Sequence, residues 1–183
     1  MAQPITEDVM AAARKGDGTA FRTIYQELAP IVLGYLRSHG VPDPEAVTSD
    51  IFVSVLQRMD RLVGGVAGLR TFVMSVAHAR YVDEARRRRR QPRAAAYDAT
   101  LDPRITGSAE DEALAYVGAA SILVLLQSLP TDQREVLSLR FVADIAIDDV
   151  AAIIGRSPGA VKQLQRRGLL ALRRLLAEQA VTR

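Results

Sequence analysis

The chain has 183 residues, of which 49% are hydrophobic, and its formal net charge is +3. This length allows one domain or two small ones. No apolar run approaches the roughly 18 residues that a membrane-spanning helix needs. Residues 1–13 include Glu7 and Asp8 and contain no apolar signal core, so we expect a cytoplasmic protein without a secretion signal. The absence of cysteine excludes disulfides and thiolate zinc sites, and two histidines are too few for a His-rich metal site, so we expect no metal and no cofactor.

The charge is distributed unevenly along the chain. Five consecutive arginines occupy residues 86–90, and the stretch 156–174 contains cations and no acids. Between them, residues 97–112 hold five acidic side chains against a single basic one, Arg104. Two basic clusters separated by an acidic connector suggest two distinct contacts with nucleic acid.

Helical periodicity begins close to the N-terminus. Thr6 is expected to cap a first helix that runs to about Lys15. Apolar residues then recur at three- and four-residue steps from Phe21 to Tyr35, which predicts a second helix that ends near residues 38–40.

Asp43 and Pro44 form the next helix start, as N-cap and first helical residue. The apolar face of this third helix is predicted to comprise Val47, Ile51, Phe52, Val55, Leu56 and Met59. Its opposite face holds Asp50, Ser54 and Gln57 at helical spacing, and from the residues alone this face is a solvent face.

A glycine-containing loop is predicted over residues 60–68, followed by a long helix from about Leu69 to Arg90. His78 lies on this helix without a second histidine or a carboxylate at ligand spacing, so we expect a surface or groove residue. Pro92 follows the helix, and residues 93–109 have little periodicity, which predicts a linker.

The C-terminal half is predicted to begin with a helix that starts at the acidic residues 110–112 and stops at Pro130. Thr131 is expected to cap the following helix. No stretch alternates as a strand does, so the predicted fold class is all-α.

Residues 144–176 read as a helix-turn-helix, which places its second helix in a DNA major groove. Gly155 suits the left-handed position that ends the first helix, and Ser157 and Pro158 suit the start of the second. Val161 and Leu164 are expected to face the core. The residues Arg156, Ser157, Lys162, Gln163, Arg166 and Arg167 then form the candidate DNA-binding set.

Several stretches together resemble an extracytoplasmic-function (ECF) sigma factor of bacterial RNA polymerase. They are AFR at 20–22, LRTFV at 69–73, the arginine run at 86–90, and SLPTDQREVL at 128–137, followed by the helix-turn-helix. The resemblance implies two small helical domains: a sigma-2 helical bundle over 1–92 and a sigma-4 helix-turn-helix domain over 110–183. Residues 93–109 correspond to the flexible linker between them.

The resemblance also implies partners and sites. It assigns the helix over 43–59 to docking on the clamp of core RNA polymerase, so that Asp50, Ser54 and Gln57 become candidate polymerase contacts, and it assigns the sigma-4 domain to the flap. It implies promoter DNA and an anti-sigma factor as further partners, and no catalytic residue. The implied contacts to the melted −10 element are Arg61, Arg70, Phe72, Arg80, Arg86 and Arg87, and the −35 contacts are the helix-turn-helix residues named above.

Two other functional classes fit the residues less well. A helix-turn-helix regulator that acts without polymerase would not need a second basic helix before the linker. Whether DNA binding depends on core polymerase would distinguish such a regulator from a sigma factor. An enzyme lacks support because no Ser/His/Asp set, metal set or phosphate-binding glycine loop is present. The sequence leaves open whether the two domains are closed or apart in the free chain.

Overall fold

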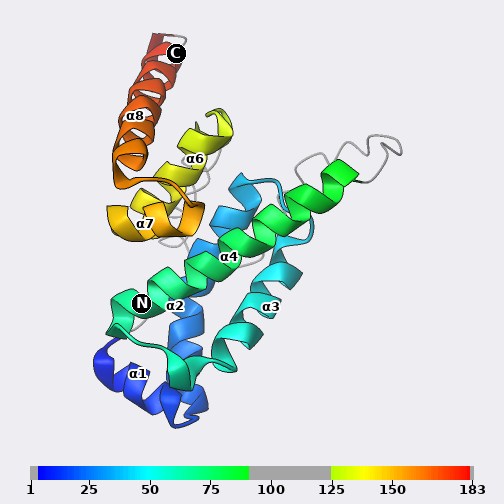
Figure 1. Ribbon diagram of the computed structural model, residues 1–183, viewed down its shortest axis with the longest axis vertical. Helices are drawn as coiled ribbons and strands as arrows, with labels where there is room; N and C mark the ends of the chain where they lie inside the picture. The colour runs from blue at the N-terminus through cyan, green and yellow to red at the C-terminus, as the bar shows by residue number, and fades with distance from the viewer. Residues whose placement is uncertain (1–3, 91–124, 182–183) are drawn as a thin grey trace.

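The structure is a computed structural model that describes residues 4–90 and 125–181 (Figure 1). These residues contain helices and no strand, which confirms the all-α fold class. The N-terminal half holds α1 (Glu7–Arg14), α2 (Gly18–Ser38), α3 (Pro44–Leu56), the 3-10 turn η1 (Met59–Arg61) and α4 (Gly65–Arg90). The C-terminal half holds α6 (Thr131–Leu137), the π-helical turn η2 (Ser138–Val142), α7 (Ile147–Ile154) and α8 (Pro158–Val181). The predicted linker and most of the helix predicted from residue 110 lie outside the described residues.

Two predicted helix starts are present as expected. The Thr6 hydroxyl accepts a hydrogen bond from the backbone N–H of Val9 at 3.3 Å, and Asp43 accepts one from Ala46 at the same distance. Asp43 itself has a left-handed φ of 47°, a conformation that aspartate tolerates better than most residues, and Pro44 starts the helix with the φ that its ring fixes. These short-range caps satisfy N–H groups that a helix start leaves without partners.

Two other predicted boundaries are wrong. Thr131 is the first residue of α6 and makes no side-chain cap, since the N-cap position is occupied by Pro130. The loop predicted over 60–68 is shorter, because η1 covers its beginning and α4 begins at Gly65. The early start of α4 depends on a distant partner: the Glu7 carboxylate, from α1, accepts a hydrogen bond from the backbone N–H of Val66 at 3.1 Å.

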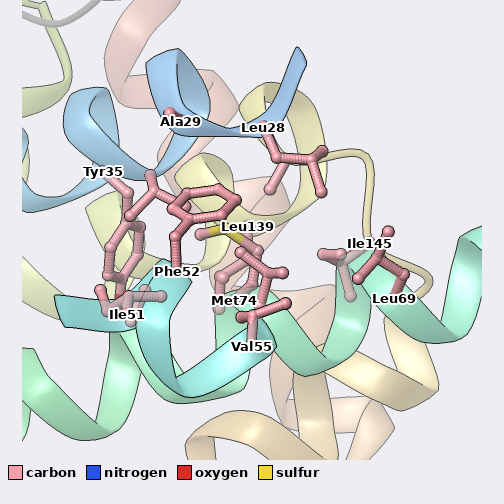
Figure 2. Close-up of a cluster of buried hydrophobic side chains, with 14 of the residues drawn as sticks. Leu28, Ala29, Tyr35, Ile51, Phe52, Val55, Leu69, Met74, Leu139 and Ile145 are labelled. Atoms are coloured by element: carbon pink, nitrogen blue, oxygen red, sulfur yellow. The ribbon is translucent and has the colours of Figure 1, made fainter. Parts of the chain in front are cut away.

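One hydrophobic core joins the two halves. A single cluster of buried side chains includes residues of α2, α3 and α4 together with residues of η2, α7 and α8. Figure 2 shows Leu139 and Ile145, from the C-terminal half, among side chains of the N-terminal half such as Leu28, Leu69 and Met74. Helix α7 packs against α4, and η2 packs against α2. The free chain therefore has its two halves in contact.

The end of α8 continues beyond this shared core (Figure 1). A second, smaller cluster forms where α8 crosses α6, and it is built from Leu126, Leu129 and Leu137 with partly buried residues of α8. Gly168 allows this close crossing, because a Cβ at this position would lie 2.8 Å from Cδ1 of the buried Leu137.

We predict that Gly68→Ala destabilises the fold around the start of α4. A Cβ at position 68 would lie 2.0 Å from the carbonyl oxygen of Val63, so the backbone of residues 62–64 has to move. Overpacking of this kind costs about 1–3 kcal/mol. Gly18→Ala is the matched control, since it also lies in a first helical turn but its Cβ would meet nothing within 4 Å. Urea unfolding of both variants measures the difference, and equal stabilities would contradict the predicted clash.

Candidate nucleic-acid interface

The helix-turn-helix has the geometry predicted for it. Gly155 ends α7 with a φ of 66°, and the Ser157 hydroxyl accepts a hydrogen bond from the backbone N–H of Ala160 at 3.3 Å. Val161 is fully buried and Leu164 packs against the same core. Because these two residues fix one side of α8, its opposite side faces solvent, and there the residues Lys162, Gln163, Arg166 and Arg167 are all exposed.

Two arginines hold the helix-turn-helix together. Arg156, one of the six candidate −35 residues, pairs with Asp132 of α6 through an Nη2–Oδ2 distance of 2.7 Å. Arg140 donates to the carbonyl oxygen of Ile145 and, at 3.4 Å, to the side-chain amide oxygen of Gln165 on α8. The exposed face is thus held by one contact from α6 to the turn before α8 and by one contact from η2 to α8 itself.

A cavity of about 800 Å³ lies beside the start of α4. Two predicted −10 residues, Arg61 and Phe72, line it, together with Arg58, which lies between α3 and η1. Arg58 was not singled out in the sequence; its signal is a cation four residues after Ser54, just beyond the polar face of α3. The cavity is lined by Arg58, Arg61, Leu62, Val63, Gly64, Ala67, Gly68, Thr71, Phe72, Ser75 and Asp149.

Phe72 lies between this cavity and a second hollow. Phe72 also lines the second hollow, which has a volume of about 410 Å³. Its other lining residues are Ser54, Arg58, Ser75, Val76, Ala79, Arg80 and Asp83. The structure thus brings an aromatic ring and three cations, Arg58, Arg61 and Arg80, to one side of α4.

The other three predicted −10 residues lie elsewhere. Arg70 forms a half-buried ion pair with Glu27 of α2, so its charge is already matched inside the protein. Arg86 and Arg87 lie further along α4 and line neither hollow. Both are exposed, and each pairs with an acidic residue one turn away.

The candidate polymerase residues lie along α3. Asp50 and Gln57 are exposed, whereas Ser54 is half-buried and its hydroxyl donates to the carbonyl oxygen of Asp50 at 3.0 Å. Two apolar neighbours, Val53 and Leu56, are 55% and 49% exposed. Leu56 was predicted to be buried, but it is exposed, because it lies one turn after Val53 on the outward side of α3. The polar face therefore adjoins an exposed apolar surface.

Comparison with known proteins places this arrangement in a family. Residues 125–174 match the family "Sigma-70, region 4". The chain is 31% identical over 180 residues to the ECF RNA polymerase sigma factor ShbA of Streptomyces griseus, a match that covers 91% of this chain and 92% of the relative. The chain belongs to the ECF RNA polymerase sigma factors.

One further relative agrees with the assignment of the chain to the sigma factors, and one solved structure agrees with its fold. The ECF sigma factor BldN of Streptomyces coelicolor is 25% identical over 175 residues; the match covers 94% of this chain and 66% of BldN, just under two thirds of that relative. A solved structure of CnrH in complex with the cytosolic domain of CnrY aligns with a TM-score of 0.61 at 20% identity, covering 96% of this chain and 99% of CnrH. This likeness supports the fold.

The histidines of this sigma factor lie in a cluster between its two halves. The prediction that His78 is a surface or groove residue is wrong, because its side chain is only 15% exposed and its Nδ1 lies 2.9 Å from Oε1 of Glu135 on α6. The same nitrogen lies 3.2 Å from the Tyr35 hydroxyl. Burial, followed by the Glu135 charge, raises the pKa of Tyr35 well above its usual value of 10. The ring of Tyr81 lies between the two histidines, 4.6 Å from His39 and 6.1 Å from His78.

His39 is buried as a neutral side chain. Its Nδ1 lies 2.8 Å from the carbonyl oxygen of Tyr35; since a carbonyl accepts, Nδ1 carries the hydrogen. Its Nε2 has no hydrogen-bond partner within the described part of the chain. Burial lowers the pKa of His39 from 6.5 to about 4.

Among the described residues, no group of acidic or histidine side chains could hold a metal ion, and no helix is long and apolar enough to cross a membrane.

We predict that His39 makes the protein less stable in acid. Its folded pKa is below its unfolded pKa, so the unfolded chain binds the proton more tightly and stability falls as pH drops from about 6.5 to about 4. At about 1.4 kcal/mol per pH unit, the full loss is on the order of 3 kcal/mol. His39→Asn keeps a donor near the Nδ1 position and removes the titration. Unfolding free energies measured from pH 7 to pH 4 should fall less steeply for this variant, and parallel curves would contradict the prediction.

Proposed function

We propose that this sigma factor directs promoter-specific initiation by core RNA polymerase, and that it does so as a specificity subunit without covalent chemistry of its own. The observation that carries the proposal is the exposed basic face of α8, held outward by the buried Val161 within the residues that match region 4. We further propose a sigma-2 domain over 1–92, a linker over 93–109 and a sigma-4 domain over 110–183.

The −35 element is assigned to the start of α8. Lys162, Gln163, Arg166 and Arg167 lie on one exposed face that follows an N-cap, the arrangement in which a recognition helix presents its first turns to base edges. A bidentate base contact contributes about 1–3 kcal/mol of discrimination. Phosphate contacts, for which Arg156 and Ser157 are candidates, fix the register of the protein on the duplex.

The −10 element is assigned to the two hollows on either side of Phe72. Opening a duplex costs free energy for unstacking and unpairing, so a protein that captures a single strand offers stacking surfaces and cations. An aromatic side chain contributes about 1–3 kcal/mol for each stacked base. Phe72 supplies the ring, and Arg58, Arg61 and Arg80 supply the cations. Arg86 and Arg87 extend the positive charge along α4, and Arg70 serves this site through the position of α4 rather than through a free charge.

Polymerase docking is assigned to the outer face of α3. Asp50, Ser54 and Gln57 offer polar contacts for the clamp, and the exposed Val53 and Leu56 beside them offer apolar area. Exposed apolar groups beside polar ones are typical of protein interfaces. The sigma-4 domain is assigned to the flap. Membership of the family adds an anti-sigma factor as the proposed inhibitor.

We predict that Lys162→Ala and Arg166→Ala each weaken recognition of the −35 element by about tenfold and leave binding to core polymerase unchanged, because each removes one base or phosphate contact. Arg173→Ala is the matched control: it removes the same charge from an exposed position two turns further along α8. Footprinting and run-off transcription measure recognition. An equal loss of polymerase binding would show that the recognition helix is placed wrongly.

We predict the opposite pattern for Asp50→Arg, which reverses a charge on the face assigned to the clamp. Its affinity for core polymerase should fall by about tenfold or more, while the binding of duplex −35 DNA by the chain itself should persist. A pull-down with core polymerase and a duplex-binding assay on the same protein preparation separate the two effects. Unchanged polymerase binding would remove α3 from the proposed interface.

The function as a whole is tested by transcription from a pooled promoter library with purified core polymerase, with and without this chain. Initiation at new sites that share a −35 and a −10 pattern is the expected result. If no new start sites arise while the chain alone retains duplex DNA, the chain is a helix-turn-helix regulator that acts without polymerase.

A further inference from the structure

Helix α1 lies beside the segment that joins α3 to α4, and its first and last residues both bind the backbone of that segment (Figure 1). The Glu7 carboxylate accepts a hydrogen bond from the backbone N–H of Val66 at 3.1 Å. The Arg14 guanidinium donates to the carbonyl oxygen of Leu62 at 2.9 Å. One charged side chain from each end of α1 therefore binds each end of residues 62–66, here called the 62–66 segment.

The 62–66 segment forms part of the wall of the cavity assigned to the −10 strand. Its first three residues line this cavity of about 800 Å³, together with Arg61 and Phe72. Val63 is 83% exposed, so its side chain is accessible to a bound strand. The hydrogen bond from Arg14 ends on Leu62, a residue of the cavity wall itself. A displacement of the segment would consequently change the shape of the cavity.

The 62–66 segment does not fix its own conformation. Gly64 and Gly65 both have left-handed backbones, with φ of 84° and 60°. Glycine permits this conformation without selecting it, because glycine adopts positive and negative φ about equally readily. The Glu7 carboxylate lies directly against Gly65, where a Cβ would be 2.2 Å from Oε1 of Glu7. The contact with Glu7 therefore selects one of the conformations that the two glycines allow.

The position of α1 itself depends on other residues. Met10 and Ala13 are buried in the main core. A carboxylate of α2 adds a further contact, because Glu27 accepts a hydrogen bond from the backbone N–H of Ile5 at 2.8 Å and also pairs with Arg70 of α4. Helix α1 is thus held against α2 and α4 independently of its two contacts with the 62–66 segment.

We propose that α1 is a positioning element for recognition of the −10 strand: Glu7 and Arg14 hold the 62–66 segment in the conformation that receives the melted bases. Neither residue lines the cavity, so both act through the segment that they bind. A segment held in its binding conformation loses less conformational entropy when the ligand binds. The preference for a particular −10 sequence then depends on two side chains outside the cavity. This inference rests on the proposed function.

The test measures −10 preference in the full chain. The probe is the strongest promoter that wild type recovers from the pooled library, together with copies that carry a substitution at each −10 position and keep the −35 element. Run-off transcription with core polymerase gives the ratio of initiation on the parent promoter to initiation on the copies. This ratio reports −10 preference, and differences in the amount of active protein cancel from it.

We predict that Glu7→Ala lowers this ratio about fivefold, because the 62–66 segment loses one of its two hydrogen bonds to α1. Glu7→Gln keeps an acceptor oxygen and should keep the ratio within about twofold of wild type. Asp8→Ala is the matched control, since it removes the same charge from the same first turn of α1 at an exposed position. Equal ratios for Glu7→Ala and Asp8→Ala would overturn the proposal.

Arg14→Ala tests the other end of the 62–66 segment. It should lower the same ratio by a similar factor, whereas Lys15→Ala, which removes the same charge from the next exposed position, should not. Both Glu7 and Arg14 are exposed, and exposed charges usually contribute little to the free energy of unfolding. Urea unfolding and binding of −35 duplex should therefore stay close to wild type. A ratio that falls only in step with the loss of stability would show a purely structural role and overturn the proposal.

The two levels of inference fail in different ways. If wild type initiates with a clear −10 preference and all four alanine variants share it, α1 is not a positioning element and the proposed function stands. If wild type directs no initiation, or initiates without any −10 preference, the proposed function fails and this inference fails with it.

Discussion

The rest of this structure depends on the burial of the η2–α7 segment against the N-terminal helices. Leu139 and Ile145 are almost completely buried in a core that also contains Leu69 and Met74. Each fully buried side chain of this size contributes about 1.5–3 kcal/mol relative to an exposed one. This burial fixes where α7 lies, and through the turn at Gly155 it also fixes the direction in which α8 points. The position of the basic face of α8 is therefore set by packing in the other half of the chain.

The polar contacts around that core determine how the two halves fit. Arg134 donates to carbonyl oxygens of Leu126, Gln127 and Leu129, which helical geometry leaves without partners near the end of a helix, and it also reaches Ser38 on α2. One guanidinium thus closes a helix end and links the two halves. Its five donors in a fixed plane suit this role, which a lysine could not fill.

Local signals were readable in the sequence, and long-range ones were not. Thr6, Asp43, Gly155 and Ser157 act within four residues of their own positions, so side-chain chemistry and spacing were enough to predict them. The start of α4 depends on Glu7, and the surroundings of His78 depend on Glu135; both partners lie far away in the sequence, and no periodicity reveals them. The same limit applies to the candidate −10 set. Arg61, Phe72 and Arg80 line the hollows on one side of α4. Arg70 instead forms an ion pair with Glu27 of α2, a partner that helical spacing does not reveal. Arg58 was missed because a cation in the short connection after a helix is ordinarily solvated.

The apolar part of the interface has a consequence for how the halves separate. Opening exposes side chains such as Leu139, Ile145 and Met74 to water, and this cost makes the open state a minor population of the free chain. A ligand shifts such an equilibrium only by as much as it prefers one state. A short single strand contacts the cavity and leaves these apolar side chains exposed, so it offers little of the required preference. A partner that binds both halves at once, as core polymerase is proposed to do, can supply a larger difference when its two contacts fit the separated halves better than the closed ones.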